Sequence, residues 1–104
     1  MKKLLASTVL AVGLMGFAGA ASAEDCGRVT IANMNWASAE VLANIDQVIL
    51  SEGYGCQAEL VAGDTTPTLT SMVEKQEPDV APEAWINSLR TLLDAAVAED
   101  KLHY

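Results

Sequence analysis

Two tryptophans, Trp36 and Trp85, are the residues of this sequence best suited to bind a ligand. An indole face is the strongest aromatic partner for a cation, and a quaternary ammonium, which has no N–H to donate, is held mainly by aromatic faces. Each tryptophan follows a short apolar segment that predicts a β-strand, and ligands of parallel α/β sheets bind beyond the carboxyl ends of the strands. The pair therefore predicts a site for a quaternary amine. The alternative is that both are core residues, because tryptophan side chains are usually buried.

The sequence holds none of the motifs that mark the common catalytic sites. It contains no G-x-S-x-G elbow, no phosphate-binding P-loop and no G-x-G-x-x-G fingerprint. His103 has no evident nucleophile as a partner, and Glu77 and Asp79 flank a proline in a turn, where solvated carboxylates are the simpler interpretation. We therefore expect a protein that is not an enzyme and that uses no cofactor and no metal ion.

The two cysteines, Cys26 and Cys56, predict a disulfide bond. Their spacing excludes a C-x-x-C redox motif, and two cysteines with one distant histidine do not make a zinc site. In an exported chain an even number of cysteines favours a structural bridge. Both cysteines precede predicted strands, so they lie side by side at one edge of the sheet if these strands are parallel neighbours.

Residues 1–23 predict a secretory signal peptide. Lys2 and Lys3 give a positive start, an apolar stretch follows from Leu4 to Ala20, and Ala21-Ser22-Ala23 forms a cleavage site. The alternative is a retained membrane anchor, but the apolar stretch is short, interrupted by glycine and not followed by a stop-transfer pattern. A lipoprotein is disfavoured because no cysteine stands at the cleavage point. We expect a periplasmic domain comprising residues 24–104.

Residues 24–104 are strongly acidic, since four basic residues stand against fourteen acidic ones and the net charge is −10. Nucleic acids and anionic membrane surfaces bind basic protein surfaces, so the composition excludes both as partners. The charge suits a neutral or cationic ligand. It is equally well explained by the solubility of an exported domain.

Apolar patterns predict alternating strands and helices in the order β-α-β-α-β-α. The expected strands are 28–32, 57–61 and 79–82, and the expected helices are 38–52, the segment between Pro67 and Pro78, and 88–98. Ser38 and Thr66 are the expected N-caps of the first two helices. Such alternation gives a parallel sheet with right-handed crossovers, and a strand order 2-1-3 brings Trp36 and Trp85 to one crevice. So small a sheet is typical of the opening section of a larger α/β protein.

Four segments resemble the periplasmic substrate-binding proteins of ABC importers for glycine betaine, proline betaine and choline. They are NWAS (35–38), GYGC (53–56), GDTTPT (63–68) and PDVAPEAW (78–85), and the similarity runs from Cys26 to about Asp94. The resemblance implies a type II periplasmic-binding fold, with residues 24–104 as the N-terminal part of its first lobe. It also implies two partners in the membrane complex, a permease to which the ligand is delivered and a cytoplasmic ATPase that drives the permease.

Members of this family hold the ammonium in an aromatic box, and the resemblance places Trp36 and Trp85 at box positions. Asn35, Ser38 and Glu83 are neighbours that could supply polar contacts. The second lobe and the other walls of the box are expected to lie outside this chain. Two hypotheses follow: a binding protein for quaternary amines, or a truncated secreted α/β domain with a structural or interaction role and no ligand of its own.

Overall fold

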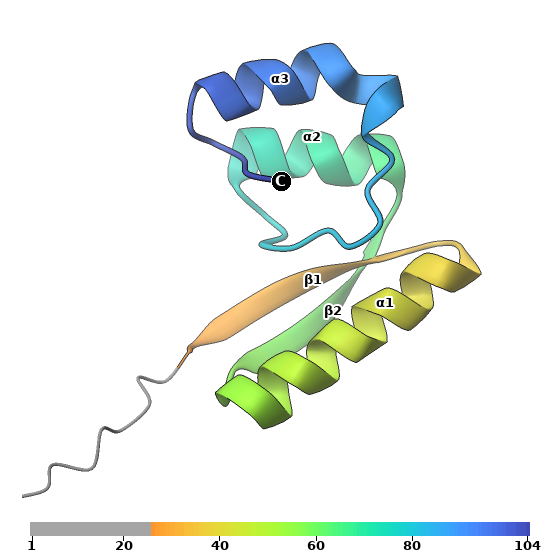
Figure 1. The fold of residues 1–104 in the computed structure, drawn as a ribbon, viewed down its shortest axis with the longest axis vertical. Helices are drawn as coiled ribbons and strands as arrows, with labels where there is room; N and C mark the ends of the chain where they lie inside the picture. Colours follow the sequence, from red (N-terminus) through yellow and green to blue (C-terminus); the bar gives the residue numbers. More distant parts are fainter. Residues whose placement is uncertain (1–25) are drawn as a thin grey trace, which may run out of the picture.

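The computed structural model describes residues 26–104, which form an α/β fold (Figure 1). The predicted signal peptide, residues 1–23, lies outside this range. The elements are β1 (Arg28–Met34), α1 (Ala37–Val48), a π-helical turn (Ile49–Gly53), β2 (Gln57–Gly63), α2 (Thr65–Lys75), a 3₁₀ turn (Ile86–Leu89) and α3 (Arg90–Ala98). Figure 1 shows α1 along one side of the strands and α2 and α3 together on the other. None of the helices in the described range combines the length and the apolar character that a membrane crossing requires.

The sheet consists of β1 and β2, which pair in parallel along their whole lengths. The predicted third strand at 79–82 is reduced to one parallel bridge, between Ile31 and Val80. Pro82 has no N–H to extend that pairing, and Glu83 turns the chain away with a φ of 54°. The parallel α/β arrangement is thus confirmed, whereas a three-stranded sheet in the order 2-1-3 is not.

The core is centred on β1, whose β-branched residues favour an extended strand. Ile31, Ala32 and Met34 have no exposed surface at all. The other large, fully buried side chains are Leu69 of α2 and Leu93 of α3. Both helices therefore contribute apolar side chains to the interior, and the burial of β1 on both faces makes it the central element.

Helix α1 buries small residues and leaves its larger apolar residues exposed. Ala39 and Ala43, which share one face of the helix, are fully buried. The residues whose spacing predicts this helix are between 40% and 59% exposed: Val41, Leu42, Ile45, Val48 and Ile49. The helix itself is therefore confirmed, but its apolar stripe is not the face that packs on the described part of the chain.

The N-caps of the first two helices differ from those expected. Trp36 precedes α1, and the Ser38 hydroxyl, instead of capping the helix, donates to the carboxylate of Glu83. Asp64 precedes α2, and its Oδ1 accepts a hydrogen bond from the N–H of Thr65 at 2.8 Å. The first turn of α1 thus has no side-chain cap, whereas in α2 a carboxylate caps the helix where a hydroxyl was predicted, and a charged oxygen is the stronger acceptor.

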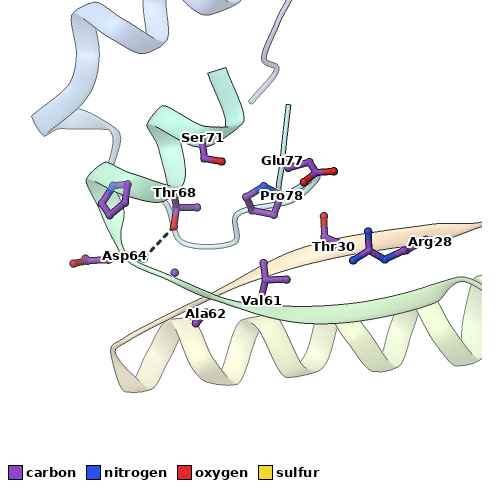
Figure 2. Close-up of a pocket in the computed structure, with 11 residues that line it drawn as sticks. Arg28, Thr30, Val61, Ala62, Asp64, Thr68, Ser71, Glu77 and Pro78 are labelled. Carbon is purple, nitrogen blue, oxygen red and sulfur yellow. Dashed lines mark hydrogen bonds between the residues drawn. The ribbon is translucent and has the colours of Figure 1, made fainter. Parts of the chain in front are cut away.

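Gly63, at the end of β2, lies where the chain passes closest to α2. A Cβ atom at this position would lie 2.7 Å from Oγ1 of Thr68 and 3.1 Å from Sδ of Met34. The Thr68 hydroxyl is held in place because it accepts a hydrogen bond from the Asp64 N–H at 3.0 Å (Figure 2). We expect Gly63→Ala to lower the free energy of unfolding by about 1–3 kcal/mol, measured by urea denaturation.

The matched control is Gly53→Ala, because a Cβ atom there meets nothing within 4 Å. Gly53 is helical, so this substitution should leave stability unchanged or raise it slightly. Equal destabilisation by the two substitutions would contradict the steric explanation for Gly63.

Candidate functional site

Trp36 and Trp85 lie against each other beyond the carboxyl end of β1. Their ring centroids are 5.8 Å apart and their planes meet at 62°, which is an edge-to-face arrangement. Trp36 is partly buried and packs against the core residues Ala32, Met34 and Ala39. Trp85, by contrast, is 64% exposed. One indole is therefore anchored in the core, and the other presents its ring to solvent beside it.

A single carboxylate, that of Glu83, joins the elements of this cluster. Its Oε1 accepts hydrogen bonds from Nε1 of Trp36 at 3.0 Å and from Oγ of Ser38 at 2.8 Å. The Ser38 hydroxyl and then the Trp36 indole N–H lower the pKa of Glu83, so the group is ionised at neutral pH. Its Oε2 is buried and has no hydrogen-bond partner within the described residues. The site thus holds a fixed negative charge with unused acceptor capacity.

The segment that carries Glu83 and Trp85 is fastened to β1 by Asp79. Oδ2 of Asp79 accepts from both the N–H and the hydroxyl of Thr30, each at 2.7 Å. The backbone adds a hydrogen bond from the N–H of Ala32 to the carbonyl of Val80 at 2.8 Å. The N–H and the hydroxyl of Thr30 also lower the pKa of Asp79. Asp79 therefore positions the second half of the tryptophan cluster.

The structure brings together four of the five predicted ligand-site residues. Trp36, Ser38, Glu83 and Trp85 form the cluster described above. Asn35 is exposed in the turn after β1, and its side chain forms no hydrogen bond within residues 26–104.

Two further residues were missed by the sequence interpretation. Asp79 was taken for a solvated carboxylate in a turn, although it anchors the cluster. Asn33, near the end of β1, has a buried Oδ1 without a hydrogen-bond partner in the described range. Buried acceptors without partners are rare in folded proteins, so this oxygen marks Asn33 as a candidate for polar contact. Nothing in the sequence around Asn33 signals this role.

The predicted disulfide bond between Cys26 and Cys56 is present, with the two Cα atoms 4.6 Å apart. It joins the segments just before β1 and β2, at the amino ends of both strands. The disulfide therefore lies at the opposite end of β1 from the tryptophan pair, and it links the amino ends of the two strands.

A groove of about 510 Å³ lies on another part of the surface, between α2 and the strands (Figure 2). Its lining includes Arg28, Thr30, Thr68, Ser71 and Glu77. No aromatic side chain lines this groove, so it offers no π-face to a quaternary ammonium. The aromatic faces that a quaternary ammonium requires lie at the tryptophan pair and not in this groove.

Comparison with known proteins identifies the family of this chain. No curated protein matches it. The OpuAC family model, described as the substrate binding domain of ABC-type glycine betaine transport system, matches residues 27–103. This range runs from β1 to beyond α3 and includes both tryptophans. The description is of a transport protein and not of an enzyme. The resemblance found in the sequence is therefore confirmed, and the chain belongs to the family of substrate-binding domains of ABC-type glycine betaine transport systems.

Proposed function

We propose that this protein is the substrate-binding component of an ABC importer for quaternary amines of the glycine betaine and choline type. The observation that carries the proposal is the contact between Trp36 and Trp85 beside the ionised Glu83, in a chain of this family. Each aromatic face contributes about 0.5–2 kcal/mol to cation binding, and the carboxylate adds attraction of the right sign. The chemistry of the cluster therefore fits a permanent cation.

The cluster residues have different roles in this proposal. Trp85 offers an exposed face to the ammonium, and Trp36 forms the second wall. Ser38 and Glu83 fix the orientation of Trp36. Asn35, which precedes Trp36 in the chain, is a further candidate for a polar contact with the ligand. Two indoles do not enclose a cation, so the complete box requires further walls. The ligand then passes to the permease of the membrane complex, which the ATPase drives.

The proposed location of the protein is the periplasm, reached by export through the signal peptide at 1–23. The disulfide between Cys26 and Cys56 supports this location, because such bonds persist in oxidising compartments outside the cytoplasm. The acidic character of the chain keeps such a domain soluble there.

Direct titration of the full chain tests the proposed function. Tryptophan fluorescence reports on the site itself, because both tryptophans of the chain belong to the cluster. Choline and glycine betaine should each change the emission in a saturable way. No response to either ligand at millimolar concentration would favour the alternative of an α/β domain without ligand binding of its own.

Trp85→Ala should weaken ligand binding far more than it weakens the fold. Its side chain is 64% exposed, so its removal leaves no cavity in the core. Loss of one cation–π contact of up to about 2 kcal/mol should lower affinity by up to about 30-fold, measured by calorimetric titration. Trp36→Ala is less informative, because Trp36 also packs on the core.

Tyr54→Ala is the matched control for this prediction. Tyr54 is an equally exposed aromatic residue, at 66%, and it follows the π-helical turn far along the chain from the cluster. Its replacement should leave affinity unchanged. A similar loss of affinity in both variants would show that Trp85 makes no specific contact with the ligand.

A further inference from the structure

We propose that Glu83 is the specificity-determining residue of this site and selects ligands of net positive charge, the choline class, over zwitterionic betaines. The inference rests on the proposed function and deepens it, because it names the charge class of the ligand. Glu83 itself has a backbone conformation that residues other than glycine rarely adopt.

The backbone of Glu83 lies in the left-handed region, with a φ of 54°. An L-residue other than glycine rarely adopts this conformation, and residues held in it cluster at functional sites. In Glu83 the conformation accompanies a carboxylate that reaches the N-terminal turn of α1, where Trp36 and Ser38 donate to its Oε1. The strained backbone conformation of Glu83 therefore accompanies the placement of a negative charge beside the two indoles.

This negative charge is not neutralised by the protein. Within the described range Glu83 forms no ion pair with a lysine, an arginine or the histidine. Its Oε2 is buried and makes no hydrogen bond to any residue that the structure describes. A buried carboxylate oxygen without a partner is costly, and a cation bound close to it lowers that cost. The structure thus leaves the negative charge of Glu83 uncompensated, and a cationic ligand would neutralise it.

The same carboxylate also alters the indole that it contacts. The hydrogen bond from Nε1 of Trp36 to an anionic acceptor polarises the ring and makes its π-face more negative. Trp36 is thereby a better partner for a cation than an indole bonded to water. Glu83 acts on the ligand both by its own charge and through Trp36.

The net charge of the ligand determines how strongly the carboxylate of Glu83 attracts it. Choline carries a single positive charge, so the carboxylate attracts the whole molecule. A betaine carries a carboxylate a few atoms from its ammonium, and repulsion between this group and Glu83 cancels part of the attraction. In addition, the hydroxyl of Ser38 in the first turn of α1 already donates its one O–H to Glu83, so it is not free to bind a ligand carboxylate. The site therefore prefers the cation to the zwitterion.

The test compares three ligands on the full chain by calorimetric titration. They are choline, glycine betaine and the uncharged isostere of choline in which a tert-butyl group replaces the trimethylammonium group. The variant is Glu83→Gln, whose amide oxygen still accepts from Trp36 and Ser38 and so preserves the geometry of the cluster. The control is Glu77→Gln, which removes the same charge from the same segment without touching the tryptophans.

We expect the wild-type chain to bind choline about tenfold more tightly than glycine betaine. Glu83→Gln should weaken choline binding about tenfold, leave the uncharged isostere within about twofold, and abolish the preference. Glu77→Gln should change none of these values by more than about twofold. Ser38→Ala, which removes a donor but keeps the charge, should retain the preference for choline.

Two results would overturn the inference while leaving the proposed function intact. One is a wild-type chain that binds glycine betaine as tightly as choline, a measurement that needs no variant to fold. The other is a Glu83→Gln variant with unchanged selectivity. Absence of binding by all three ligands to the wild-type chain would instead defeat the proposed function, and the inference with it.

Discussion

Replacing both Cys26 and Cys56 with serine should lower the free energy of unfolding by about 3–4 kcal/mol. The bond closes a loop across 30 positions of the sequence that contains β1, α1 and the turn into β2. Without the bond the unfolded chain gains the conformational entropy of that open loop, which sets the size of the expected effect. Since small domains are stable by only about 5–15 kcal/mol, a large part of the stability would be lost. Urea denaturation followed by tryptophan fluorescence measures the change.

Reduction of the wild-type protein provides the control for this prediction. Dithiothreitol should bring the wild-type unfolding curve onto that of the double variant and should leave the variant itself unchanged. A reduced wild-type protein as stable as the oxidised one would mean that the unfolded chain is held compact in some other way.

Asp79→Ala should lower the free energy of unfolding by about 2 kcal/mol and disturb the tryptophan cluster at the same time. The substitution removes the acceptor of two hydrogen bonds from Thr30, whose backbone is buried. Hydrogen bonds to a charged group contribute about 1.5–3 kcal/mol, and the exposure of Asp79 favours the lower part of that range. Thermal unfolding measures stability, and the tryptophan emission maximum, to which Trp36 and Trp85 both contribute, reports whether the cluster has come apart.

The control for Asp79→Ala is Glu74→Ala, which removes an exposed carboxylate from α2 that has no hydrogen bond to any described residue. This variant should match the wild-type protein in both measurements. If the two variants were equally destabilised, the loss would come from net charge and not from the contact with Thr30.

The contribution of Asp79 should depend on pH. Hydrogen bonds from Thr30 lower the pKa of Asp79 in the folded chain below the value of about 3.9 for a free aspartate. A lowered folded pKa means that the stabilisation is fully present above about pH 3.9 and is lost as the pH falls through the folded pKa. The difference in stability between wild-type and Asp79→Ala should therefore be constant from neutral pH to about pH 5 and should shrink at more acidic pH.

Local patterns were sufficient to predict most elements of this fold. The β-branched run at β1, the apolar spacing of α1 and the two cysteines each carry their own signal, and the structure contains both elements and the disulfide. The third strand was predicted at 79–82, but its reduction to one bridge could not be, because the position of this segment depends on contacts between Asp79 and Thr30 that no local pattern encodes.

The candidate site was predictable in its residue types but not in its connections. Two tryptophans after two predicted strands pointed to one crevice, and the structure places them in contact. The role of Glu83 as the common acceptor of Trp36 and Ser38 depends on a left-handed backbone conformation, at a position where the sequence has no glycine or asparagine to indicate it. The exposure of the apolar stripe of α1 could not be predicted either, since periodicity shows that a helix is amphipathic but not which surface covers its apolar face.

The tryptophan cluster also sets an order of events for the folding chain. The hydrogen bond from Trp36 to Glu83 spans 47 residues, and that from Thr30 to Asp79 spans 49. Contacts of such separation carry a larger loop-closure cost than the pairing of β1 with β2, whose register joins residues fewer positions apart. The strand pair and its disulfide can therefore form first, and the two indoles meet only after the chain has closed over them. The tryptophan pair therefore exists only once residue 85 has joined the folded strand pair, which makes it a late-forming part of this structure.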